Sequence, residues 1–223
     1  MTADAIRDAV RNLCGVSSTY ADLTDANIHS YVHEAMLLAA YEAAPMALRV
    51  AYAQNSVDGT HTYAAYTAPV LFVASAKANG QPVPLIDQDQ LDNIAPNWEA
   101  TTKAAAQKYA VIADHTSGIL NVRFWPTPNY STANAIVIRS IKEPTAPSGT
   151  SEITEFPEFL HHGFVKYAAY RHLLNQTETG SNDNKHLACK TDWEQAKLLY
   201  VQFEQDNNSV QSRRAMAQRV ARA

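Results

Sequence analysis

Two histidines four residues apart are the first candidates for chemistry in this 223-residue chain. His29 and His33 share one face of a predicted helix, and Glu34 follows them directly. Their order differs from the zinc-binding pattern His-Glu-x-x-His, and the sequence names no third ligand. We therefore expect a solvated or interface surface here. A metal-dependent hydrolase using His29 and His33 stays an alternative that metal analysis would test.

The remaining polar residues do not have the spacing of a catalytic site. His161 and His162 point about 100° apart on a helix, and His172 lies about 16 Å from His161 along the helix axis. There is no Gly-x-Ser-x-Gly motif, phosphate-binding loop or dinucleotide fingerprint. We expect helix caps or solvated loops for two acidic pairs, Asp87 with Asp89 and Glu152 with Glu155. The sequence thus predicts no enzyme, and no catalytic residue, metal or cofactor.

Aromatic residues beside a base could instead stack against nucleic acid. Strand alternation would place Arg123 and Trp125 on one face and Phe124 on the other, which makes a poor stacking platform. We expect core packing here, with the arginine extending along it.

The C-terminus offers a different chemistry, because its charge is opposite to that of the rest. The last fifteen residues, SVQSRRAMAQRVARA, contain four arginines and no acid. The whole chain has a net charge of −4, so the rest of the chain carries −8. Arginine forks bind carboxylates, and Met216 and Val220 add a small apolar stripe. The predicted binding residues are Arg213, Arg214, Met216, Arg219, Val220 and Arg222.

Composition predicts a protein made in a cytosol. Hydrophobic residues form 46% of the chain, which is enough for a core, and no apolar run approaches the length of a membrane span. We therefore expect no membrane contact. Cys14 and Cys189 are predicted to be reduced core residues.

Helices are predicted at both ends of the chain. The first covers residues 3–14 and ends at Gly15, and the second runs from Thr24 or Asp25 to about Ala44, before Pro45. Two more follow Pro157. One places six residues within an arc of about 140°: Phe159, Leu160, Phe164, Tyr167, Tyr170 and Leu174. The other has a narrow apolar seam: Cys189, Trp193, Ala196, Tyr200 and Phe203.

Between these helices the apolar period changes to that of strands. Five short strands are predicted to form a sheet, with a hairpin turn at Asn79-Gly80. The fold class is therefore α+β: a four-helix body, a small β-rich domain inserted between the second and third helices, and an extended C-terminal tail. The predicted ranges are 1–58 with 143–208 for the body, 59–142 for the insertion and 209–223 for the tail.

Four stretches resemble the head-to-tail adaptor (connector) proteins of tailed bacteriophages. They are LTDANIHSYVHEAMLLAA, YTAPVLFVASAKANGQPVPLIDQDQLDNIAPNW, VRFWPTPN, and IKEPTAPSG with the later EFPEFLHHGFVKYAAYRHLL. Together they cover most of residues 20 to 176. The similarity is one of layout and a few loosely fixed residues.

The resemblance implies a structural virion protein of the neck. Such adaptors form homo-oligomeric rings, commonly of twelve subunits, beneath the portal protein and above a tail or lower-neck protein. DNA passes through the ring without sequence-specific binding. Their C-terminal extensions engage the portal, and residues 205–223 are the matching stretch here. Two alternatives stay open, a tail-completion protein and a nucleic-acid-binding module that uses the arginine-rich tail.

Overall fold

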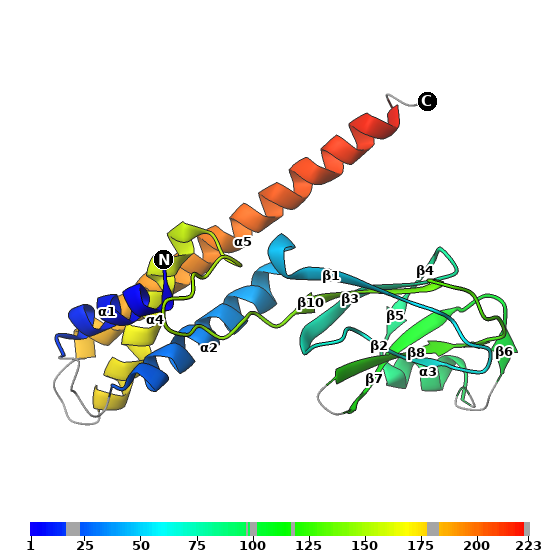
Figure 1. Cartoon of the computed structure of the whole chain (residues 1–223), viewed down its shortest axis with the longest axis horizontal. Helices are drawn as coiled ribbons and strands as arrows, with labels where there is room; N and C mark the ends of the chain where they lie inside the picture. The colour runs from blue at the N-terminus through cyan, green and yellow to red at the C-terminus, as the bar shows by residue number, and fades with distance from the viewer. Residues whose placement is uncertain (17–22, 97, 99–101, 117–118, 178–182, 221–223) are drawn as a thin grey trace. The chain divides into compact units, whose positions relative to one another are not determined.

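The computed structural model describes residues 1–16, 23–96, 98, 102–116, 119–177 and 183–220. For residues 113–116, 177, 183 and 209–220 it describes the backbone alone. The chain divides into two compact units (Figure 1). The helical unit comprises Met1–Leu48 and Pro144–Ala223, and the β unit comprises Arg49–Glu143. The predicted α+β class is confirmed.

The helical unit contains four α-helices in the described residues. They are α1 (Ala3–Cys14), α2 (Asp25–Ala43), α4 (Glu158–Thr177) and α5 (Asp183–Val220). The first two begin as the sequence predicts, because the Thr2 and Thr24 side chains accept hydrogen bonds from backbone N–H groups of the first turns. Gly15 ends α1 with a φ of 72°, a left-handed conformation that suits glycine.

Helix α4 is the centre of this unit, since it packs against α1, α2 and α5. Its contact with α5 is close: a Cβ at Gly163 would lie 2.9 Å from the Cβ of Ala196. Trp193 is buried as predicted, and its ring lies 5.2 Å from that of Tyr167. Tyr200 is buried nearby against Phe156. Aromatic contacts therefore join α4 to α5 in this core.

Three residues predicted to face the core are exposed: Phe159, Leu174 and Phe203. Phe159 and Phe203 lie at the margins of the predicted apolar faces, where their rings contact each other at 5.5 Å but stay partly open to solvent, and Leu174 lies in the last turn of α4. The predicted tail begins within α5, whose backbone continues as helix to Val220.

The β unit holds ten short strands in the described residues, not the five predicted. One sheet has the order β1 (Arg49–Gln54), β10 (Ile136–Lys142), β3 (Val70–Ala78), β4 (Gln81–Val83). A second has the order β2 (Thr62–Ala64), β8 (Ile119–Trp125), β7 (Tyr109–Thr116), β5 (Leu85–Ile86). A two-stranded sheet pairs β6 (Lys103–Ala104) with β9 (Thr127–Pro128), and a short helix, α3 (Gln88–Ile94), follows β5.

The two four-stranded sheets share one apolar core. Ile136 and Ile138 of β10 and Val122 and Phe124 of β8 are all buried in it. The predicted hairpin is confirmed, because Asn79 and Gly80 both have positive φ between β3 and β4. Strand β1 pairs with β10 from Arg49↔Ile141 to Gln54↔Ile136, so the first and last strands of the unit lie side by side.

Candidate docking surfaces of the helical unit

The predicted binding residues of the C-terminus lie on a continuation of α5. Figure 1 shows α5 as one unbroken helix, from orange to red. Positions 213, 216 and 220 follow at three- and four-residue spacing, which is the spacing of one helix face. Arg222 lies outside the described residues, as do the side chains of the other five.

Packing in its first half holds α5 in place. Its last buried residue in the described part is Glu204, whose carboxylate accepts a hydrogen bond from the Met46 N–H at 3.2 Å. Burial, together with the Glu204 charge, raises the pKa of Tyr200. From Glu204 to Val220 the helix extends about 24 Å. The tail is thus a helical projection from a firmly packed base.

Ion pairs connect the three longest helices. Lys166 of α4 contacts Asp192 of α5 at 2.8 Å, and Arg171 of α4 contacts Glu34 of α2 at 3.1 Å. Lys197 of α5 reaches two carboxylates, at 2.8 and 2.9 Å. Before residue 209 this unit has fifteen acidic and seven basic residues. Most of its bases are therefore neutralised internally, and the excess acids remain.

The predicted histidine pair is not brought together with further metal ligands. His33 Nε2 donates to the Pro144 carbonyl at 3.1 Å, and the buried Nε2 of His29 has no hydrogen-bond partner in the described part. Within the described residues, no group of three His, Cys, Asp or Glu side chains could hold a metal ion. This surface thus offers no assembled metal centre among those residues.

His161 is a structural residue. Its Nε2–H donates to the Phe156 carbonyl at 3.2 Å, and its Nδ1 accepts from the Met1 amino group at 2.9 Å. Burial, and next the positive charge of that amino group, lower the pKa of His161. The ring is therefore held neutral in the folded protein.

The aromatic cluster of the β unit packs internally. Strand β8 alternates as predicted, with Phe124 buried. Arg123 lies over the Trp98 ring at 4.6 Å, and Trp125 stacks on Tyr109 at 6.2 Å. The arginine and these rings contact one another, which agrees with the expected packing role.

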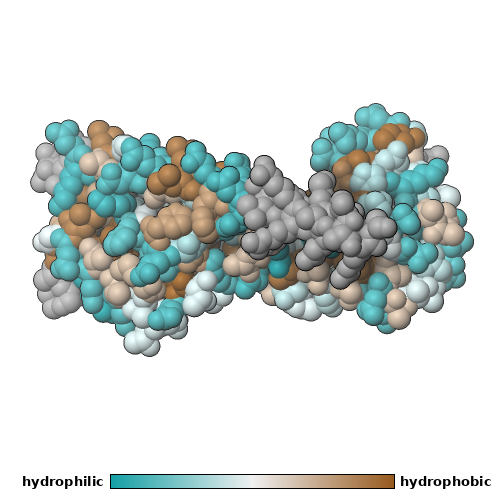
Figure 2. All heavy atoms as spheres, turned by 90° about the horizontal axis from the view of Figure 1, so that it is seen from above, coloured by the Kyte–Doolittle hydropathy of each residue, from teal (hydrophilic) through white to brown (hydrophobic). Residues whose placement is uncertain are grey.

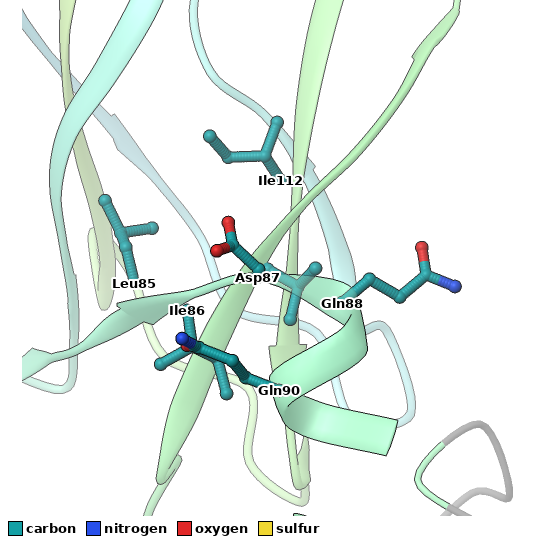
Figure 3. A pocket seen from close by; sticks show the side chains of 7 residues that line it. Leu85, Ile86, Asp87, Gln88, Gln90 and Ile112 are labelled. Carbon is teal, nitrogen blue, oxygen red and sulfur yellow. The ribbon is translucent and has the colours of Figure 1, made fainter. Parts of the chain in front are cut away.

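The sequence did not predict a cavity of about 370 Å³ in the β unit. It lies where β5 gives way to α3, and Figure 3 shows the Asp87 carboxylate between Leu85 and Ile112. Gln88 and Gln90 supply the other polar groups. This lining includes no nucleophile paired with a base, so it has no catalytic constellation.

A comparison with known protein families shows which family this chain belongs to. A family model described as SU10 adaptor protein matches residues 1–223. The chain belongs to the SU10 adaptor protein family. The resemblance to phage head-to-tail adaptors is thereby confirmed, and the match includes both units and the tail. No curated protein matches the chain.

The surface of this SU10 adaptor carries several large apolar side chains. Figure 2 shows hydrophobic residues, in brown, among hydrophilic ones on the face in view. Among the described side chains of the helical unit the exposed ones are Leu38, Tyr41, Phe159, Leu174, Leu187, Leu198, Leu199 and Phe203. None of the helices has a stretch, among the described residues, long and apolar enough to cross a lipid bilayer.

Proposed function

We propose that this adaptor is a structural, non-enzymatic protein of the virion neck, made in the cytoplasm of the bacterial host. It forms a ring beneath the portal and joins the capsid to a tail or lower-neck protein. The observation that carries this proposal is the family match along the whole chain. A ring of twelve subunits is the expected assembly.

The portal contact is assigned to the tail helix. Residues 209–223 contain four arginines and no acid, and α5 extends well beyond Glu204, the last buried residue among its described side chains. A basic helix that projects in this way could lie in an acidic groove of a partner. Arg213, Arg214, Met216, Arg219, Val220 and Arg222 are the proposed portal-binding residues.

The acidic body suits a conduit for DNA. Before residue 209 the helical unit carries a net charge of −8, and DNA phosphates are repelled by such a charge. A lumen lined by these acids would let DNA slide without binding a particular sequence.

Deleting residues 209–223 tests the portal contact. The shortened protein should melt like the full chain, yet lose its complex with the portal in sedimentation at micromolar concentrations. The Arg213→Glu/Arg214→Glu variant should lose most of that affinity. Equal portal binding by the full and shortened chains would overturn the role of the tail, and no complex with the full chain would overturn the adaptor proposal.

The four arginines of the tail are also the basis of the alternative function, a nucleic-acid-binding module. A DNA-binding tail predicts an affinity for duplex DNA that falls steeply as salt rises and disappears on deleting residues 209–223. An adaptor tail predicts little DNA affinity in the isolated chain. A tail-completion protein would instead bind tail components and ignore the portal.

A further inference from the structure

Three exposed apolar side chains gather where α4 begins, and we name them the aromatic patch. They are Phe159, Leu199 and Phe203, which are 44%, 60% and 41% exposed. The Phe159 ring lies 5.5 Å from that of Phe203 and 6.4 Å from that of buried Tyr200. These contacts fix the patch on the core. Glu158 beside it is exposed and forms no ion pair within the described part of the chain.

A second apolar group lies near the other end of the α4–α5 pair, and we name it the lysine patch. It comprises Leu187, which is 53% exposed, and Lys190, which lies three residues further on and neighbours it on the surface of α5. The Lys190 ammonium lies 5.9 Å from the centre of the Tyr170 ring, which also stacks on His186. Among the described residues Lys190 has no carboxylate partner, unlike Lys166 and Lys197.

The two patches face different directions on one rigid helix. Leu187 and Leu199 are twelve residues apart on α5, which corresponds to about 18 Å along the axis and about 120° around it. One patch has an acidic neighbour and the other a basic one. A contact between unlike surfaces repeats from copy to copy and generates a ring when the rotation closes.

We propose that the aromatic patch of one copy docks against the lysine patch of the next, with Glu158 meeting Lys190 across the interface. This inference rests on the ring of the proposed function and names its subunit contact. Each patch offers only a few large side chains, well below the ~800 Å² per partner of a stable interface. The contact is therefore weak in solution and becomes strong when a portal ring holds neighbouring copies together.

A third exposed apolar side chain, Leu198, serves as the control. Leu198 is 59% exposed, nearly the same as Leu199, but it points about 100° away from it. Next to it, Lys197 is already paired with Glu42 and Glu194. Leu198 lies on nearly the same face of α5 as Leu187 but about 16.5 Å further along the axis, so the proposal leaves it outside both patches.

A mixing experiment tests the contact with three variants of the full chain. Leu199→Asp breaks the aromatic patch, Leu187→Asp breaks the lysine patch, and Leu198→Asp is the matched control. Sedimentation velocity is measured up to hundreds of micromolar protein in high salt, which screens the repulsion between acidic bodies. Circular dichroism confirms that each variant folds.

The wild type and Leu198→Asp should associate, and Leu199→Asp and Leu187→Asp alone should stay monomeric. A mixture of the two broken variants retains one intact pair of patches and should form dimers that do not grow. A monomeric wild type, a monomeric mixture, or equal damage from Leu198→Asp would overturn the proposal. Portal binding through the tail is measured separately, so its failure is distinguishable.

Charge reversal tests the ionic part. Glu158→Lys and Lys190→Glu should each weaken association several-fold, because like charges then face each other. Both changes in one chain restore an opposite pair between copies and should restore association. This experiment is done at low salt, where charges are screened less and charge reversal has a larger effect on association. A double variant no better than the singles would remove this pair from the interface.

Discussion

The helical and β units differ in charge and in the contacts that build their cores. Before residue 209 the helical unit carries −8, whereas residues 49–143 contain seven acids and seven bases. In the helical core, aromatic rings of α4 and α5 contact one another, while isoleucine, valine and alanine make up most of the core shared by the two sheets. The charge difference suggests that partners of the helical unit are selected electrostatically, and the core difference implies that each unit can be destabilised separately.

Removing the largest buried ring should give the largest effect. Trp193 is 1% exposed and contacts rings of α4, so Trp193→Ala should lower the free energy of unfolding by about 3–5 kcal/mol. Chemical denaturation followed by far-ultraviolet circular dichroism measures the loss. An unchanged midpoint would contradict the placement of α5.

The matching change in the β unit is Ile138→Ala. Ile138 is fully buried in the shared core of the two sheets, so its truncation should cost about 2–5 kcal/mol. If the units unfold separately, each variant should shift a different transition in calorimetry. A single unfolding transition that both variants shift would contradict separate unfolding of the helical and β units.

Gly163→Ala should destabilise the helical unit by about 1 kcal/mol. Alanine favours a helix by about 1 kcal/mol over glycine, but the added methyl would lie 2.9 Å from Ala196 and overpacking costs about 1–3 kcal/mol. Thermal unfolding measures the balance. A stabilised variant would mean that α4 and α5 separate easily.

Acidification should weaken the helical unit through His161. Because the pKa of His161 is lowered in the folded state, the unfolded chain takes up a proton first as the pH falls below about 6.5. The free energy of unfolding should therefore decrease with falling pH until the folded-state pKa is passed. A His161→Asn variant, measured from pH 7.5 to 5, should show a smaller decrease, whereas an identical slope would contradict the assignment.

The smallest expected effect concerns the reactivity of the Cys14 thiol. Burial, followed by the proximity of Cys189, raises the pKa of Cys14 to about 11, so at pH 8 its thiolate should be about a hundredfold scarcer than that of an ordinary cysteine. Both cysteines belong to the helical unit. Labelling by a thiol reagent should thus be slow and should not respond to Ile138→Ala. Rapid labelling of Cys14 in the native protein would contradict the burial.

The sequence predicted elements that have local end signals. Thr24 and Gly15 mark helix ends, and Asn79-Gly80 marks a hairpin, because each favours one backbone geometry. Strands of two or three residues, such as β5 and β6, are too short for a period to show. Helix α3 was missed for a similar reason, since Leu91 is its only buried residue.

The candidate surfaces were harder to predict than the fold. An apolar residue in a helix period indicates a core position, so Phe159 and Phe203 were assigned inward although both are exposed. Which margin of an apolar face meets a neighbour depends on tertiary packing, which periodicity does not contain. The tail was found because four arginines without an acid form a signal in composition alone.

The pairing of β1 with β10 also makes this chain suitable for modular engineering. The β unit begins at Arg49, and Arg49 lies opposite Ile141, so the entry and exit points of the unit are about 5 Å apart. A short turn could replace residues 49–143 and still join the two halves of the helical unit. Conversely, the same two points would accept a foreign domain whose termini are close together, which would give each copy in an assembly its own cargo.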